Sequence, residues 1–206
     1  EVEYQVVNCP DYGVPQQRKR LVLLASRFGE IHLIPPLYDA EHYITVRDAI
    51  GHLQPIEAGE ICPDDILHRS SALSAINMER IQQSVPGGTW RDWDENLRLK
   101  CHRKESGATF PSVYGRMEWD EPSPTMTTQF YGYGNGRFGH PEQNRAISLR
   151  EGAILQSFPD DYIFIDDLHP AKKRELGTHI GNAVPVELGR AIGMSIQQHL
   201  TEMGVN

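Results

Sequence analysis

Alternating apolar and polar residues at the start of the chain predict two strands. Val2, Tyr4 and Val6 alternate with polar residues, which is typical of a half-buried strand. The apolar run from Leu21 to Ser26 predicts a second, buried strand, and Ile31 to Ile34 is expected to extend it after a turn.

Helix signals follow in the middle of the chain. Thr45 as an N-cap, with Asp48 three residues later, predicts a short helix. Apolar residues recur at roughly helical spacing from Ser70 to Ser84, and a Pro-Gly-Gly sequence then ends the predicted helix. No clear period emerges from Thr89 to Gly115, which is therefore expected to be irregular.

The last third carries clearer signals. Residues 125–128 form a strand-like run, and Ser148 with Glu151 forms a capping box that predicts a helix through Phe158. Pro170 is suited to the first turn of another helix, which would end near Gly177. Pro185 is expected to begin the last helix, whose apolar stripe recurs every four residues at Leu188, Ile192, Ile196 and Leu200.

Composition narrows the class of protein. The chain has 206 residues, 39% of them hydrophobic, which suits one large or two small domains. No apolar run is long enough for a membrane helix, and no signal peptide precedes the first residues, so a cytoplasmic location is expected. Three cysteines without a C-x-x-C pair favour a reducing compartment, and no residues have the spacing of a zinc site.

The charge distribution is uneven. The net charge of −8 weakens a nucleic-acid interpretation, because a basic surface is the usual footprint of such proteins. Basic residues nevertheless gather at Arg18–Arg20, at Arg98–Lys104 and at Arg116, while the acidic residues cluster elsewhere. The total charge therefore does not exclude a DNA-binding protein.

The stretch from Gly13 to Arg20 is the most informative. Arg18 and Arg20 lie two residues apart, so in an extended backbone their side chains point the same way. Two guanidinium groups on one face suit an anionic partner rich in acceptors, such as phosphate with a base edge. A solvated arginine pair beside a strand explains these eight residues equally well.

Three sets of motifs together resemble the DNA (cytosine-5)-methyltransferase family. The first set is Gln16-x-Arg18-x-Arg20, and the second is Arg116 followed by Pro122–Thr128. The closing group comprises His140–Arg145, Ser148–Glu151, Leu155–Asp160 and Ile180–Pro185. Their order and spacing agree with the family from one end of the chain to the other.

The family's earlier motifs are absent from these residues. A glycine-rich turn after the first strand and a Pro-Cys-Gln nucleophile loop do not occur, and Glu95-Asn96-Leu97 stands in the wrong order to be the family's Glu-Asn-Val. The resemblance therefore implies the C-terminal part of such an enzyme. The expected fold class is α/β: a fragment of a Rossmann-like, S-adenosylmethionine-dependent catalytic domain with a small, irregular α+β target-recognition domain.

The resemblance also implies a domain division. Residues 1–37 would end the catalytic domain, residues 38–178 would form the target-recognition domain, and residues 179–206 would return to the catalytic domain. Separated from its sheet, the first part is expected to leave strand edges and an apolar face uncovered.

Site roles follow from the same resemblance. Arg20 would donate to oxygen 2 of a flipped cytosine, Arg18 would orient a missing glutamate or hold a phosphate, and Gln16 would shape their loop. Asn182, Ala183 and Val184 would lie against S-adenosylmethionine where the last helix opens, although Asn182 as an ordinary N-cap is an alternative.

DNA contacts are expected at four positions. Thr125 and Thr127 would meet the backbone beside the flipped nucleotide, and Gly134 would let a loop follow the duplex closely. Arg116 would read a guanine edge or touch phosphate. The alternatives are β-propensity for Thr125 and a solvated surface arginine for Arg116.

The expected partners are duplex DNA and the missing N-terminal catalytic portion, in the same or a separate chain, with a homodimer possible through exposed edges. This chain alone is predicted to be inactive, because the nucleophilic cysteine is absent. The alternative function is a non-catalytic DNA-binding or assembly subunit of a split methyltransferase. No metal is expected.

Overall fold

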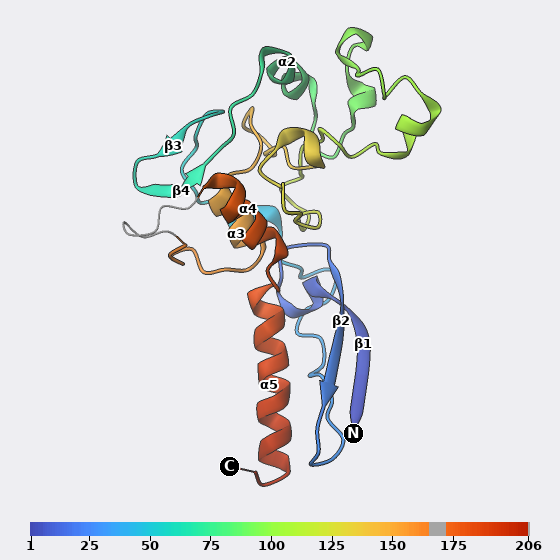
Figure 1. The fold of residues 1–206 in the computed structure, drawn as a ribbon, viewed down its shortest axis with the longest axis vertical. Helices are drawn as coiled ribbons and strands as arrows, with labels where there is room; N and C mark the ends of the chain where they lie inside the picture. Colours follow the sequence, from blue (N-terminus) through green and yellow to red (C-terminus); the bar gives the residue numbers. More distant parts are fainter. Residues whose placement is uncertain (165–171, 206) are drawn as a thin grey trace.

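The computed structural model describes residues 1–164 and 172–205, with the side chains of all of these except Glu105 and Ala108. Figure 1 shows two halves joined near the middle of the chain's long axis. The regular elements are β1 (Val2–Asn8), β2 (Lys19–Ala25), α1 (Val46–Ile50), β3 (Ile61–Cys62), β4 (Asp65–Arg69), α2 (Ala75–Gln83), α3 (Leu149–Leu155), α4 (Lys173–Asn182) and α5 (Val186–Glu202).

One half is the β1–β2 hairpin with α5 alongside it (Figure 1). The two strands pair antiparallel, which confirms that both segments are strands, but β2 is buried on one face only and not throughout as predicted. Val22 and Leu24 of β2 are buried in one core with Leu188 and Ala191 of α5. The prediction that residues 31–34 extend the strand is wrong: their apolar side chains enter this core from irregular backbone.

The opposite face of the hairpin is apolar and open to solvent. Tyr4 pairs with Leu23 and Val6 with Leu21, and these four side chains are between 59% and 71% exposed. The expectation of an uncovered apolar face is confirmed. The alternation that predicted a half-buried strand was real, but it marks the exposed side of the hairpin in this chain.

The other half holds α1, α3, α4 and β4 around a second core, and α2 contributes Ile81 to a third core with Trp90, Trp93 and Leu97. Both capping boxes are present, at Thr45 with Asp48 and at Ser148 with Glu151, so the starts of α1 and α3 are confirmed. α3 ends at Leu155 rather than at Phe158, where it was expected to end. The β3–β4 hairpin was missed because β3 has only two residues and a register shift interrupts the pairing.

The stretch from Thr89 to Gly115 is irregular, as predicted. It contains the short 3₁₀ helices η2 (Trp90–Asp92), η3 (Glu95–Leu97) and η4 (Glu105–Thr109) and no strand. Residues 125–128 also form no strand, which corrects that prediction. Pro170 lies outside the described residues.

α5 begins after Pro185, as predicted, but buries a different face. Its buried residues are Leu188, Ala191, Ser195 and His199, while Ile196 is 41% exposed. Each step of four residues turns about 40° past a full turn, so over three steps the predicted stripe rotates by ~120° away from the hairpin. The buried residues are three or four positions apart, a spacing that keeps them all on the face of α5 that packs against the hairpin.

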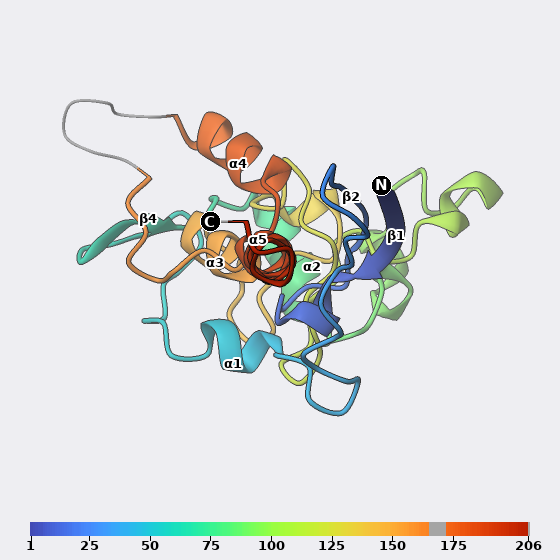
Figure 2. The ribbon, with the colours of Figure 1, turned by 90° about the horizontal axis from the view of Figure 1, so that it is seen from below.

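Figure 2, seen from below, places β1 and β2 together on one side of α5 and β4 with α3 on the other. Both sheets are two-stranded and antiparallel in the part of the chain that is described. Among those residues no helix has the length and apolar character required to cross a membrane.

Candidate functional site

The side-chain amide of Gln16 joins segments that are far apart in the sequence. Its Nε2 donates to the Leu155 carbonyl at 3.1 Å and to Gln156 Oε1 at 3.0 Å. Its Oε1 accepts from the Met126 N–H at 2.8 Å and from Arg18 Nη1 at 3.3 Å. We call these contacts, together with those of Gln156, the Gln16 node.

Gln156 extends the node to the end of α4. Its Nε2 donates to the carbonyls of Ile180 and Gly181, at 2.8 and 3.3 Å. Gly181 also lies directly on Thr127, since a Cβ there would fall 2.3 Å from the Thr127 oxygen. Segments from all three motif sets therefore meet at one buried point, because Gln16 and Gln156 are fully buried.

Backbone hydrogen bonds fasten the loop before β2 to residues 123–125. Gln17 N–H donates to the Ser123 carbonyl at 2.8 Å, and Ser123 N–H donates to the Pro15 carbonyl at 3.0 Å. The Thr125 hydroxyl donates to the Gln17 carbonyl at 2.6 Å. Thr125 is exposed and therefore holds this loop from its solvent side.

Arg18 enters the node and is 6% exposed. Its Nη1 donates to the Met126 carbonyl at 3.0 Å, while its buried Nε has no partner among the described residues. Burial lowers the pKa of Arg18, and the charge of Arg20 lowers it further. A buried guanidinium with a spare donor suits an acceptor, a carboxylate or phosphate oxygen.

Arg20 lies beside Arg18 at the start of β2, and its guanidinium is only partly covered. It donates to the Lys19 carbonyl at 2.7 Å and forms no ion pair with a described carboxylate. Both arginines act electrostatically on Cys9, whose thiol pKa is nevertheless raised by burial. Both arginines are thus close to Cys9, but only Arg20 is accessible enough to contact a ligand.

The residues expected at the cofactor lie at a different helix end from the one predicted. Asn182 is the last residue of α4, not the start of α5. The first amides of α5 are already engaged, because Val186 N–H donates to the Gln156 carbonyl and Glu187 N–H to Ser157 Oγ. The N–H groups of Val186 and Glu187 are therefore not free for a ligand, whereas Asn182 itself is exposed.

Arg116 does not lie on a DNA-facing surface. It is 4% exposed, and each of its nitrogens donates to an acceptor of the protein. The acceptors are the carbonyls of Ile81, Ser84, His140 and Gln143 and the side chain of Asn144. With every N–H group engaged, Arg116 braces two other chain segments, residues 81–84 and 140–144, and has no N–H group left to offer DNA.

The two remaining predicted DNA positions are surface features. Thr127 is exposed, and its hydroxyl accepts from the Gln129 N–H at 3.3 Å. Gly134 lies in the short helix η5 (Tyr133–Asn135), where an added Cβ would come within 3.0 Å of the Tyr114 ring. A larger residue at this position would therefore have to displace the Tyr114 side chain slightly.

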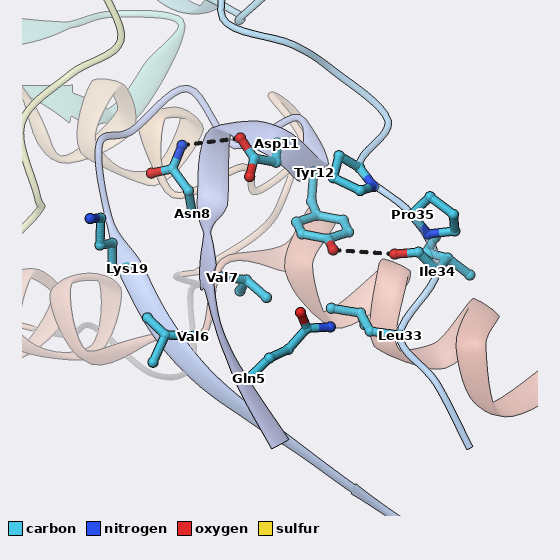
Figure 3. A pocket seen from close by; sticks show the side chains of 11 residues that line it. Gln5, Val6, Val7, Asn8, Asp11, Tyr12, Lys19, Leu33, Ile34 and Pro35 are labelled. Carbon is cyan, nitrogen blue, oxygen red and sulfur yellow. Dashed lines mark hydrogen bonds between the residues drawn. The ribbon is translucent and has the colours of Figure 1, made fainter. Parts of the chain in front are cut away.

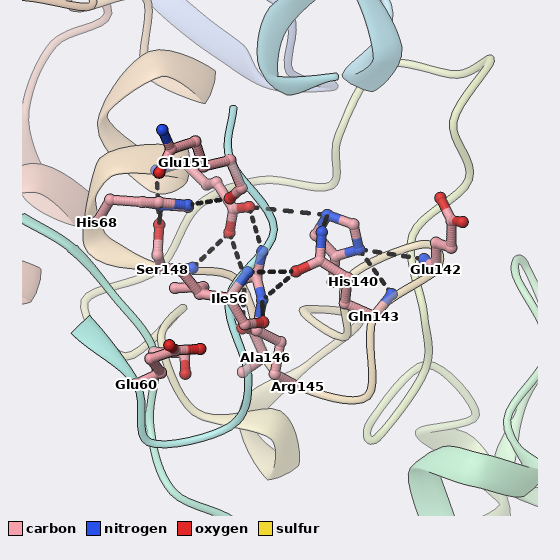
Figure 4. A network of polar contacts seen from close by, with 12 residues as sticks. Ile56, Glu60, His68, His140, Glu142, Gln143, Arg145, Ala146, Ser148 and Glu151 are labelled. Atoms are coloured by element: carbon pink, nitrogen blue, oxygen red, sulfur yellow. Dashed lines mark hydrogen bonds and ion pairs between the residues drawn. The ribbon is translucent and has the colours of Figure 1, made fainter. Parts of the chain in front are cut away.

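A buried ion pair supports α3 behind the node (Figure 4). Arg145 Nη1 and Nη2 each donate to a Glu151 carboxylate oxygen at 2.7 Å, and both side chains are at most 1% exposed. Burial alone would raise the pKa of Glu151, but Arg145 lowers it to about 2. Neighbouring His140 is kept neutral because burial lowers its pKa to about 4.

A cavity of about 580 Å³ lies beside β1 and is lined partly by Gln5, Lys19 and the segment 33–36. Figure 3 shows Tyr12 at its wall, donating to the Ile34 carbonyl at 3.2 Å. None of Gln16, Arg18 and Arg20 lines it, so it is distinct from the node. No group of described His, Cys, Asp and Glu residues is arranged to hold a metal ion.

Sequence reasoning missed two parts of the node. Met126 contributes its backbone N–H and carbonyl, which no side-chain pattern identifies. Gln156 belonged to one of the motifs but had no assigned role. The feature that could have identified it is a polar amide that follows the apolar residues at the end of a predicted helix. A buried amide needs partners, so its neighbours had to be polar groups from other segments.

Comparison with known proteins adds the family. The sequence profile of the C-5 cytosine-specific DNA methylases matches residues 1–198. The type II methylase M.HgiDII of Herpetosiphon aurantiacus is 57% identical over 199 residues, which are 97% of this chain and 56% of that protein. The type II methyltransferase M1.HphI of Haemophilus parahaemolyticus is 35% identical, over 95% of this chain and 48% of that protein.

A solved structure shares the fold. A candidate DNA modification methyltransferase encoded within an E. coli prophage superposes with a TM-score of 0.68, covering 98% of this chain and 61% of that one at 19% identity. The chain thus spans about half the length of M.HgiDII and M1.HphI.

Proposed function

Because the chain belongs to the C-5 cytosine-specific DNA methylase family, we propose that it supplies the DNA-recognition part of a DNA cytosine-5-methyltransferase, with one wall of the base and cofactor pockets. The reaction would transfer methyl from S-adenosylmethionine to carbon 5 of a cytosine turned out of duplex DNA. The Gln16 node carries the proposal, since it gathers the motif segments beside Arg18 and Arg20.

The chemistry defines what the pocket must provide. A cysteine thiolate would add to carbon 6 of the ring, and carbon 5 would take the methyl group as its bond to the cofactor's sulfonium sulfur breaks. Loss of the carbon-5 proton to a base and elimination of the thiolate would then restore the ring. Negative charge grows on the ring during addition, so donors at nitrogen 3 and oxygen 2 lower the barrier. No Pro-Cys-Gln occurs in the 206 residues, and we propose that the rest of the enzyme supplies the sulfur.

Arg20 is the proposed donor to oxygen 2 of the base. Arg20 is partly exposed and has no carboxylate partner among the described residues, so apart from the bond from Nη1 to the Lys19 carbonyl its guanidinium has donors for an acceptor. Arg18, held by Gln16 and Met126, is proposed to present its spare Nε to a glutamate or a phosphate. Gln16, which accepts from Arg18, is proposed to shape the loop that carries both arginines.

The proposed cofactor contacts are Asn182, Ala183 and Val184. S-adenosylmethionine, when bound, supplies the methyl group. The exposed Asn182 amide offers donors and an acceptor, and Val184, 65% exposed, offers an apolar surface next to it. The donor set therefore fits a ligand with both polar groups and an adenine ring, whereas the engaged amides of α5 take no part.

Duplex DNA is proposed to pass beside Thr125, Thr127 and Gly134. The Thr125 hydroxyl holds the loop through Gln17 and retains lone pairs, so its role is to set the position of this loop against the backbone. Residues 1–37 and 179–206 would belong to the catalytic domain, and residues 38–178 to target recognition. The shared core of β1, β2 and α5 supports this division.

The test is methyl transfer from labelled S-adenosylmethionine to duplex DNA. The 206-residue chain alone is expected to give no incorporation above background, and turnover by it would contradict the proposal. Reading the gene upstream of Glu1 is a second test. A Pro-Cys-Gln in the same frame would place the nucleophile in the same polypeptide, and its absence would favour a separate subunit.

A further inference from the structure

An exposed basic segment in the recognition half remains outside the site described above. Residues 98–110, here called the basic arm, project from the molecule as the yellow-green loop of Figure 1. Figures 1 and 2 both show the basic arm on the same side of α5 as β1 and β2. It contains Arg98, Lys100, Arg103 and Lys104 within seven residues that include no Asp or Glu.

We propose that the basic arm is a duplex-DNA contact element whose Lys100, Arg103 and Lys104 hold backbone phosphates. This inference rests on the proposed function and assigns the contacts that Arg116 cannot make. In a chain of net charge −8, binding to a polyanion requires cations concentrated at one place. The arm is such a place.

Trp90 anchors the basic arm at two points. The His102 ring stacks on the Trp90 ring with centroids 4.3 Å apart and planes at 15°. Trp90 Nε1 donates to the Phe110 carbonyl at 3.1 Å. Between these points tight turns follow one another, because Lys104 N–H donates to the Cys101 carbonyl and Gly107 N–H to the Lys104 carbonyl.

The anchor leaves the cationic side chains turned to solvent. His102 is 8% exposed, whereas Lys100, Arg103 and Lys104 are all exposed. Among the described residues no carboxylate lies within ion-pair distance of these three cations. Arg103 donates to the Glu95 carbonyl, which holds the position of its guanidinium without neutralising its charge.

Two acidic side chains near the basic arm, Asp92 and Asp94, already accept hydrogen bonds from other residues. Asp92 accepts from the Thr89 N–H at 2.7 Å, and Asp94 accepts from Gln83 Nε2 at 2.7 Å. The arm also carries an exposed aromatic residue, since Phe110 is 67% exposed although its carbonyl is held by Trp90. Cations without a described carboxylate partner, on the same segment as an exposed ring, suit a nucleic acid better than an acidic protein, because a nucleic acid offers both phosphates and bases.

The decisive measurement is the salt dependence of duplex binding by the 206-residue chain. The triple variant Lys100→Gln, Arg103→Gln, Lys104→Gln is expected to flatten the slope of log Kobs against log salt by up to ~2.7, about 0.9 for each phosphate contact. The matched control changes three exposed arginines outside the arm to Gln: Arg27, Arg174 and Arg190. The control is expected to leave the slope within experimental error of the unmodified chain.

The outcomes separate the two proposals. If the unmodified chain binds duplex and both triple variants have its slope, the arm proposal is overturned while DNA recognition stands. If the unmodified chain does not bind duplex even at low salt, both are overturned. If polyglutamate competes as well as duplex of equal charge, the arm is a general anion surface and the DNA assignment is overturned.

Lysine acetylation gives a readout that requires no variant. Bound duplex is expected to protect Lys100 and Lys104 several-fold, while exposed Lys172 stays unprotected. Equal labelling of all three lysines with and without duplex would contradict the inference.

Discussion

Replacing Glu151 by glutamine tests whether the buried Arg145 pair holds the recognition half together. The substitution keeps the shape of the side chain but removes the only carboxylate bonded to Arg145 in the described part of the chain. Arg145 is fully buried, so its charge would remain without compensation. Breaking one side of such a pair typically costs about 3 to 5 kcal/mol.

The pKa of Glu151 gives a second estimate of how much the ion pair stabilises the fold. A carboxyl held at about 2 instead of its ordinary 4.5 corresponds to roughly 3 kcal/mol of stability at neutral pH. The folded-state pKa is lowered, so this stability is complete above pH 4.5 and is lost as the pH falls toward 2. The two estimates agree within about 1 kcal/mol.

Urea unfolding followed by tryptophan fluorescence is a suitable assay, since Trp90 and Trp93 are buried. Glu151→Gln is expected to lower the free energy of unfolding by about 3 to 5 kcal/mol at pH 7. The exposed Glu142→Gln is the control and should change it by less than about 0.5 kcal/mol. The difference between wild type and Glu151→Gln should shrink as the pH falls from 4.5 to 2.

A double-mutant cycle distinguishes loss of the Arg145–Glu151 interaction from nonspecific destabilisation of the fold. Arg145→Met combined with Glu151→Leu removes both charges, so its cost should be clearly smaller than the sum of the two single costs. A cost of Glu151→Gln no greater than that of Glu142→Gln, or strict additivity in the cycle, would refute the reasoning.

Three further predictions concern other parts of the molecule. His140→Gln should remove the loss of stability between pH 6.5 and about 4, where the unfolded state binds a proton that buried His140 does not; an unchanged stability–pH curve would contradict this. Gln16→Leu should leave the Met126 N–H unsatisfied and cost about 1 to 3 kcal/mol or more in urea unfolding, and a neutral result would remove the node's structural role. Val6→Lys with Leu23→Lys should reduce any self-association through the open hairpin face, measured by sedimentation velocity, whereas association unaffected by the change would place the contact elsewhere.

Local signals in the sequence predicted the starts of several elements well. Alternation placed β1, and the Thr45 and Ser148 boxes placed the starts of α1 and α3, because these signals depend on residues within one turn or strand. The motif resemblance also brought distant segments into one site. The resemblance relied on the order and spacing of motifs along the chain, whereas local periodicity says nothing about which distant segments meet.

Burial was the property that the sequence could not supply. Arg116 carries a charge that suggests solvent or DNA, yet backbone carbonyls from two distant segments, residues 81–84 and 140–143, enclose it. Asn182 was expected to open a helix and instead closes one, because the N-terminal amides of α5 are satisfied by residues after α3. In both cases the partners come from segments distant in sequence, so no local pattern identifies them.

The role of Arg20 is the central claim, and the complete enzyme that contains this chain tests it most directly. Arg20→Ala is compared with the exposed neighbour Lys19→Ala, and both kcat for methyl transfer and Kd for duplex DNA are measured. We predict that Arg20→Ala lowers kcat by roughly 100- to 1,000-fold with Kd nearly unchanged, because the donor acts on charge that develops only during reaction. A weakened Kd with normal kcat would contradict the account.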